Sequence, residues 1–210
     1  IGYFTQEPNE ARVMIFFGKY VGTVRKTGYY WVNPFITRKK LSLRIRNMDI
    51  DPIKVNDKVG NPVLIGMVLV WKIKDTYRAV FDIDSQSLGL NGSGINNAAL
   101  EKFVRIQSDA ALREVTGHYA YDQTGSDANE LTLRDGGEEI NELLERKINE
   151  RLAIAGMEVV EARLNYLAYA PEIAAVMLRR QQASAIISAR EKIVEGAVSM
   201  VKMAIDRIET

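Results

Sequence analysis

The chain has 210 residues, of which 47% are hydrophobic and 26% charged, and its formal net charge is +1. This composition supports a large apolar core and excludes a disordered chain. The absence of cysteine excludes disulfides, thiol nucleophiles and cysteine-ligated zinc, and the single histidine, His118, makes a histidine metal site or a Ser-His-Asp triad hard to build. No stretch approaches the roughly 18 uninterrupted apolar residues that a membrane-spanning helix needs.

The first half of the chain is predicted to be β-structure, because apolar and aromatic residues alternate there or form short runs between turn residues. The predicted strands are residues 13–20, 29–32, 40–46, 50–55 and 63–74. Alternation in residues 40–46 predicts that Leu41, Leu43 and Ile45 point inward and that the outer face is basic. The nearly continuous apolar run of residues 63–71 predicts a strand covered on both faces.

The second half changes to helical spacing. Asp75 and Thr76 are suitable caps for a short helix that ends at Phe81. Gly156 is placed as a C-terminal cap, and Pro171 is placed to open a terminal helix. The remaining predicted elements are a loop at residues 85–97, helices at 103–116 and 138–155, and a strand at 158–164. This order predicts an α+β domain at residues 1–170, with a β-rich lobe at 1–75 and a smaller α/β lobe at 76–170, followed by a coiled-coil helix at 171–210.

The terminal helix carries an apolar repeat with alternating steps of four and three residues. Its members are Ala183, Ile187, Arg190, Val194, Ala197, Val201, Ala204 and Ile208. A spacing of 3.5 residues keeps one seam of a helix facing a partner, so we expect this seam to mediate homo-oligomerisation. The alternative is a helix packed on its own domain, which also needs an apolar stripe.

Charge is unevenly distributed along the chain. Residues 12–46 hold nine basic residues and no acid, whereas residues 135–161 hold eight acids and three basic residues. We expect the basic residues to face an anionic lipid leaflet, with Arg38, Lys39, Lys40, Arg44 and Arg46 forming the membrane-facing set. The rival use of these charges is docking on the acids of a neighbouring subunit. Nucleic acid is not an expected partner, because the aromatic residues among these basic residues alternate like sheet-core residues.

No constellation in the sequence predicts catalysis, a cofactor or a metal. Three candidate patterns have ordinary structural interpretations, namely a glycine-rich loop with no phosphate-binding lysine after it, acids at a helix start, and two serines on the terminal helix. The residues concerned are Gly89, Gly92 and Gly94, then Glu138, Glu139 and Glu142, then Ser184 and Ser188.

Read end to end, the sequence resembles the SPFH or band 7 family of stomatins, prohibitins and flotillins, and most closely a bacterial stomatin-like branch. The matching pieces include Pro8-Asn9-Glu10-Ala11, Phe17-Gly18-Lys19-Tyr20, Asn33-Pro34-Phe35, Lys54-Val55-Asn56-Asp57, Gly60-Asn61-Pro62, Ala111-Leu112-Arg113-Glu114-Val115, Gly156-Met157-Glu158-Val159, Ala170-Pro171-Glu172-Ile173 and residues 179–198. One departure is the segment 85–100, which is longer than the compact loop expected there.

The resemblance implies a membrane anchor before a two-lobed SPFH domain, and a coiled coil after it. The start at Ile1 is expected to mark a piece without that anchor, and the heptad helix is expected to continue past Thr210. The implied function is a non-enzymatic, oligomeric scaffold on the cytoplasmic side of a bacterial membrane, with membrane proteases as candidate clients. The alternatives are a protease subunit with its own hydrolase site and a nucleic-acid-binding or soluble adaptor module.

Overall fold

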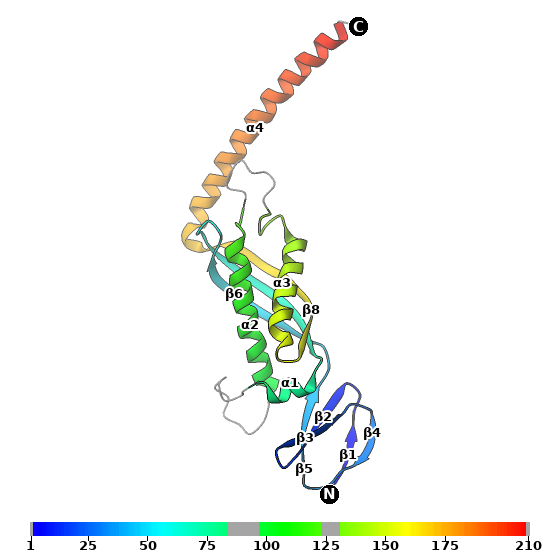
Figure 1. Cartoon of the computed structure of the whole chain (residues 1–210). Helices are drawn as coiled ribbons and strands as arrows, with labels where there is room; N and C mark the ends of the chain where they lie inside the picture. The colour runs from blue at the N-terminus through cyan, green and yellow to red at the C-terminus, as the bar shows by residue number, and fades with distance from the viewer. Residues whose placement is uncertain (1, 84–96, 123–130, 209–210) are drawn as a thin grey trace. The chain divides into compact units, whose positions relative to one another are not determined.

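A computed structural model describes residues 2–83, 97–122 and 131–208 of the chain. The chain divides into two units, Ile1–Ala168 and Tyr169–Thr210. The first unit holds three of the described helices and all eight described strands, except that the last residue of strand β8 falls in the second unit. The second unit consists of the terminal helix α4 (Pro171–Ile208) and the residues beside it. The predicted α+β class, with antiparallel sheets first and a long helix last, is confirmed (Figure 1).

The N-terminal lobe is built from two small antiparallel sheets. Strands β1 (Tyr3–Gln6) and β4 (Gly28–Trp31) form one, and the other has the order β3-β2-β5, from β2 (Glu10–Phe16), β3 (Lys19–Val24) and β5 (Ile36–Ser42). Its core consists of the buried side chains Phe4, Ala11, Val13 and Leu41.

The predicted single strand at residues 13–20 is in fact two strands joined by a tight turn. Phe16 pairs with Lys19, so Phe17 and Gly18 alone form the loop of the β2–β3 hairpin. Both have positive φ, 45° and 83°, which is the pattern of a type I′ turn. The left-handed conformation costs a residue with a Cβ roughly 1–2 kcal/mol, so sequence rules place Asn or Gly rather than Phe at this position.

The predicted strand at residues 40–46 is also displaced. Strand β5 ends at Ser42, which pairs with Glu10 at the start of β2, so the partner strand goes no further. Leu43 instead donates its backbone N–H to the carbonyl of Asn9 at 2.9 Å. Leu43 is half-buried, and Ile45, which was expected to point inward, is 60% exposed.

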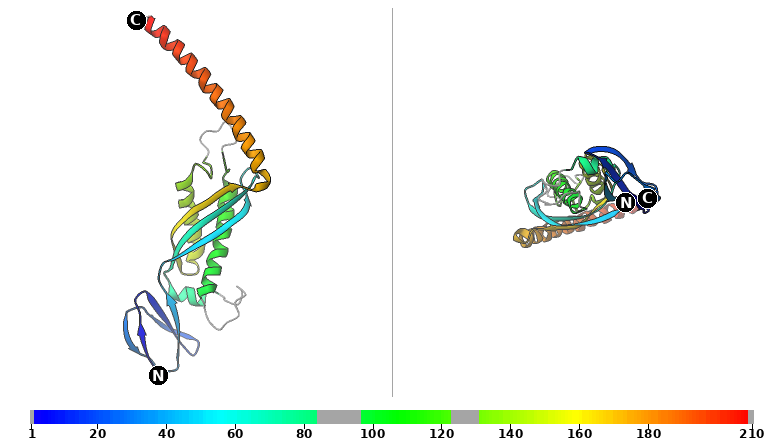
Figure 2. Two further views of the ribbon diagram at one scale, coloured as in Figure 1. Left: turned by 180° about the vertical axis from the view of Figure 1, so that it is seen from behind. Right: turned by 90° about the horizontal axis from the view of Figure 1, so that it is seen from below.

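The second lobe consists of a three-stranded sheet with helices on one of its faces. The sheet has the order β6-β7-β8, from β6 (Arg46–Asn56), β7 (Pro62–Ile73) and β8 (Met157–Tyr169). Helices α2 (Asn97–His118) and α3 (Gly137–Ala153) lie side by side across this face, and α1 (Thr76–Phe81) follows β7 (Figures 1 and 2). The fully buried side chains Trp71, Leu112 and Leu144 come from the sheet and from both long helices.

Strand β7 is completely buried on only one face. Its odd-numbered side chains, which face the helices, are at most 4% exposed. Leu64, Val68 and Val70 on the other face are only half-buried, so the expectation of a strand covered on both faces is wrong. A continuous apolar run does not distinguish full from partial coverage of the second face.

Side chains from the helices form hydrogen bonds with backbone groups of both outer strands of this sheet. On α3, the side-chain oxygens of Asn141 and Asn149 accept hydrogen bonds from the backbone N–H groups of Leu164 and Val159 in β8, at 3.0 and 3.1 Å. On α2, Arg105 and Arg113 donate to the carbonyls of Asp49 and Lys54 in β6, at 3.4 and 3.3 Å. On each helix the two side chains are eight residues apart in the sequence. Covering edge groups in this way disfavours pairing with a strand of another chain.

The buried carboxylate of Asp57 fixes the β6–β7 connection and joins it to the end of α2. It accepts hydrogen bonds from the backbone N–H groups of Val59, Asn61 and Tyr121, at 3.0, 2.7 and 3.1 Å. This loop contains the Asn56-Asp57 and Gly60-Asn61-Pro62 pieces of the family resemblance. In this structure these pieces therefore shape the loop.

The predicted Asp75 cap is confirmed, because its carboxylate accepts from the N–H groups of Tyr77 and Arg78 at the start of α1. The predicted cap at Gly156 is wrong. Helix α3 ends at Ala153 with Ile154 as its C-cap, and Gly156, which is left-handed with φ +70°, lies in the turn two residues further on. Helix α2 begins at Asn97, six residues before the predicted start, and β8 extends beyond the predicted residues 158–164. The expected loop at residues 85–97 lies outside the described residues except for Asn97.

Candidate interaction surfaces

Helix α4 exposes nearly all of its side chains. The predicted seam residues from Ala183 to Ala204 are all exposed, with Ile187, Val194 and Val201 at 59%, 62% and 60%. Ile208 closes the helix at its last residue. Beta-branched residues at three seam positions and alanine at three others form a surface on which a second helix can pack closely.

A second apolar stripe on α4 was missed by the sequence analysis. It consists of Ile186, Ala189, Ile193, Gly196, Met200 and Met203, each one residue before a member of the first seam. Its four large side chains are 55–71% exposed. One residue corresponds to about 100° around a helix, so α4 presents two adjacent seams. The repeat of Ile186, Ile193 and Met200 at intervals of seven was the signal that could have revealed it.

The end of the N-terminal lobe that holds the β2–β3 and β4–β5 turns carries exposed aromatic side chains. We call Phe16, Phe17, Trp31 and Phe35 the aromatic end. Phe17, Phe35 and Trp31 are 82%, 73% and 64% exposed, and Phe16 packs edge-on against Phe17 with ring centroids 4.7 Å apart. An isolated aromatic side chain on a protein surface is ordinary, but a cluster of exposed aromatic side chains indicates an interaction site.

The five predicted membrane-facing basic residues do not form a single face. Arg38 lies over the ring of Phe4 at 5.4 Å, and Lys40 forms an ion pair with the buried Glu10 at 2.7 Å. Lys39 is half-buried and lies on the face of β5 opposite to that of Arg38 and Lys40. Arg44 is exposed in the connection to β6, and Arg46 belongs to the second lobe. The sequence run therefore distributes its charge over two lobes.

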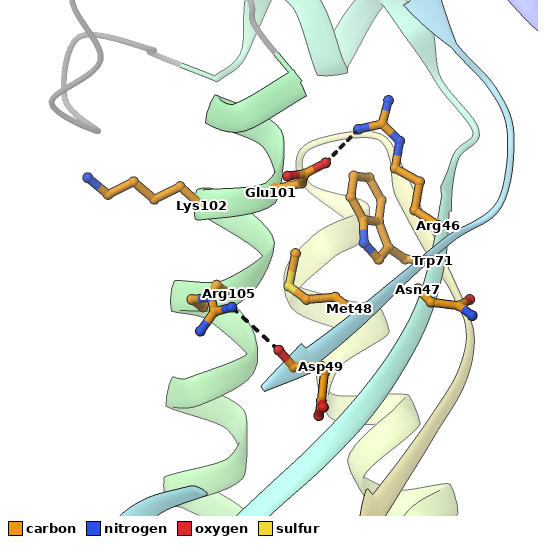
Figure 3. Close-up of a pocket in the computed structure, with 8 residues that line it drawn as sticks. All are labelled: Arg46, Asn47, Met48, Asp49, Trp71, Glu101, Lys102 and Arg105. Atoms are coloured by element: carbon orange, nitrogen blue, oxygen red, sulfur yellow. Dashed lines mark hydrogen bonds and ion pairs between the residues drawn. The ribbon is translucent and has the colours of Figure 1, made fainter. Parts of the chain in front are cut away.

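Arg46 lines a cavity of about 450 Å³ between the start of β6, β7 and α2 (Figure 3). Its guanidinium lies over the Trp71 ring at 5.3 Å and pairs with Glu101 at 3.3 Å. Across the cavity, Arg105 pairs with Asp51 at 3.1 Å. These charges are matched within the chain, and the lining holds no nucleophile next to a base, which is what covalent catalysis requires.

Two carboxylates of this lobe have a pKa below the usual value because of hydrogen bonds from basic side chains. Glu114 on α2 accepts from Arg151 and Lys147 on α3, at 2.8 and 3.1 Å, which lowers the pKa of Glu114. Lys74 and Lys72 lower the pKa of Glu158 in the same way. In contrast, burial raises the pKa of Asp109, opposed by Arg105 and Arg113. All three shifts arise from packing and ion pairs of the fold.

The residues weighed for chemistry in the sequence are scattered. His118 is exposed at the end of α2, whereas Ser184 and Ser188 are exposed on α4. The acids Glu138, Glu142, Glu145 and Glu161 line a groove of about 360 Å³ between α3 and β8. In the described part of the chain, no group of three or more His, Cys, Asp or Glu is placed to hold a metal ion. No described helix is long and apolar enough to cross a membrane.

Comparison with protein families gives a match over most of the chain. The model described as SPFH domain / Band 7 family covers residues 4–198, which include the whole first unit apart from its first residues and most of α4. No curated protein matches the chain.

Proposed function

The chain belongs to the SPFH domain / Band 7 family, and we propose that it is a non-enzymatic, membrane-associated scaffold that assembles through helix α4. Family membership is consistent with such a scaffold. The observation that carries the proposal is the exposure of the heptad seam along α4. Apolar side chains left in water at regular helical spacing are stabilised when a second helix covers them.

The second stripe favours an assembly in which each helix has two neighbours. One neighbouring helix covers one seam, whereas the stripes around Val194 and Ile193 point about 100° apart. Covering both therefore takes a helix on each side. An interface of this kind joins different faces of identical subunits and builds rings or filaments rather than isolated pairs.

The membrane part of the proposal places the N-terminal lobe at an anionic leaflet on the cytoplasmic side of a bacterial membrane. The exposed bases Arg38, Lys40 and Arg44 supply attraction of roughly 1 kcal/mol each when close to the lipid surface. Lys40 contributes less, because Glu10 already pairs with it. Membrane proteases remain candidate clients of the assembly.

The assembly test compares two double variants of the full chain by light scattering. Val194→Asp with Val201→Asp introduces charges into the first seam, and burying them unpaired is costly. We expect the mass to fall toward the 23.6 kDa protomer. Ser188→Asp with Ser199→Asp adds the same charge at exposed positions of α4 outside both stripes and should leave the mass unchanged.

A third double variant, Ile193→Asp with Met200→Asp, tests the second stripe. If each helix has two neighbours, this variant should also reduce the mass. An unchanged mass in both seam variants would show that α4 does not mediate assembly. Labelling of the purified chain by a serine-reactive probe, lost on Ser184→Ala or Ser188→Ala, would favour the alternative of a hydrolase.

A further inference from the structure

We propose that the aromatic end of the N-terminal lobe inserts into the headgroup–acyl boundary of a phospholipid bilayer, with Phe17 at its tip. This inference rests on the proposed membrane association and specifies its chemistry. Contact would be made by hydrophobic insertion, with the basic residues in a supporting role.

Strand register brings the two aromatic turns together. Phe16, the last residue of β2, is paired with Ile36, the first residue of β5, so the β2–β3 turn lies beside the β4–β5 turn that contains Phe35. Trp31, the last residue of β4, is paired with Tyr3, and Val32 donates its N–H to the carbonyl of Gly2. Four side chains separated by up to 19 residues in the sequence therefore belong to one end of the lobe, the end where the N-terminus lies in Figure 1.

Phe17 is the residue whose presence the fold does not explain. It is 82% exposed, so its ring contributes little to the core. Its φ of 45° is strained for a residue with a Cβ, and Asn or Gly would form the same two-residue turn without that strain. An exposed, strained aromatic residue at the tip of a hairpin indicates a role outside the fold.

The chemistry of the surroundings favours lipid as the occupant. Phe side chains partition into the apolar boundary, while the amphipathic indole of Trp31 and ring of Tyr3 suit the interface between headgroups and acyl chains. Lys19, paired directly with Phe16, is exposed beside the tip, and Arg38 is exposed two residues after Ile36. These cations complement lipid phosphates around an inserted apolar tip.

The two tryptophans of the chain allow insertion to be measured directly. Trp31 belongs to the aromatic end and is 64% exposed, whereas Trp71 is 0% exposed under α2 and serves as an internal reference. The full chain is mixed with phosphatidylcholine vesicles with and without phosphatidylserine. We expect a blue shift of the emission and quenching by lipids brominated on their acyl chains. Both signals should be lost in Trp31→Phe, which keeps an aromatic ring.

Binding of Phe17→Asn and Phe35→Ser to the same vesicles is measured by sedimentation, with Val59→Ser as the matched control. Val59 is 54% exposed in the β6–β7 connection, far in sequence from the aromatic end. Removing one inserted Phe should weaken partitioning roughly tenfold or more. The thermal midpoint of Phe17→Asn should be unchanged or higher, because Asn suits the left-handed turn, so weaker binding cannot result from unfolding.

Each outcome decides between the proposals. If the wild-type chain binds vesicles, but Phe17→Asn binds equally well and Trp31 is not quenched, insertion is wrong and membrane association stands. If the wild-type chain binds no vesicle, both proposals fail. If Phe17→Asn reduces the mass of the assembly in the absence of lipid, the aromatic end is a protein interface and the lipid proposal is overturned.

Discussion

The first unit and helix α4 differ in the burial of their apolar side chains. In the domain, α2 and α3 cover one face of the sheet, and Asn and Arg side chains occupy backbone groups of both outer strands. Along helix α4, by contrast, the described side chains of both apolar seams are exposed. From this contrast we expect stability to depend on the domain and association to depend on the helix, and each expectation can be tested separately.

The largest expected effect is on the stability of the domain. Leu144 on α3 is 0% exposed, so Leu144→Ala removes buried methyl groups and leaves a cavity. We expect the free energy of unfolding to fall by about 2–5 kcal/mol, measured by denaturant titration. The mass of the folded assembly by light scattering should not change, because α4 is untouched. A loss of assembly in this variant would show that association depends on the domain core.

An intermediate effect is expected at the edge of β8. Replacing Asn141 and Asn149 by Ala removes two acceptors for backbone N–H groups, at about 0.5–1.5 kcal/mol each. It also leaves an outer strand with unpaired donors, so concentration-dependent association should appear by light scattering even when α4 carries Val194→Asp and Val201→Asp. Glu150→Ala, an exposed position of α3, is the control. A monodisperse double Asn variant would show that other features protect this edge.

The smallest effect is a pH dependence of domain stability. The pKa of Glu114 is lower in the folded chain than the usual value of about 4.3 in an unfolded chain. Its ion pairs therefore stabilise the domain above that value, and the contribution is lost as pH falls through the lowered pKa. The urea midpoint should decrease on acidification, and less so in Glu114→Gln.

Asp109 acts in the opposite direction. Its pKa is raised by burial, so its charged form opposes folding at neutral pH, and protonation on acidification relieves that cost. Asp109→Asn should therefore show a steeper loss of stability with acid than the wild-type chain. If the urea midpoints of the wild-type chain and of Glu114→Gln change equally between about pH 6 and pH 3, the range that brackets the usual carboxyl pKa, the role assigned to Glu114 is contradicted.

Local patterns in the sequence predicted most elements but not their pairing. The class, the Asp75 cap and the long terminal helix were correct, because each depends on neighbouring residues. The Phe17 turn was missed because its first residue is not a turn former, and the end of β5 was misplaced because only the length of β2 determines it. Alternation alone does not show where a partner strand stops.

The candidate surfaces were predicted in part. The first seam of α4 was predicted from spacing alone, and its role in assembly stays a prediction. The aromatic end could not be predicted, because it requires the register that brings Phe35 beside Phe16. Likewise, the run of basic residues looked continuous in sequence, although strand alternation and the Glu10 ion pair divide it in space.

The eight-residue spacing of both edge-binding pairs has a consequence for changes in chain length. Arg105 and Arg113, like Asn141 and Asn149, reach the sheet from the same side of their helices because eight residues make slightly more than two turns. Inserting or deleting one residue between the members of a pair rotates one of them by about 100° and removes it from its strand. Between the two members of each pair, the number of residues is therefore as strictly constrained as their type.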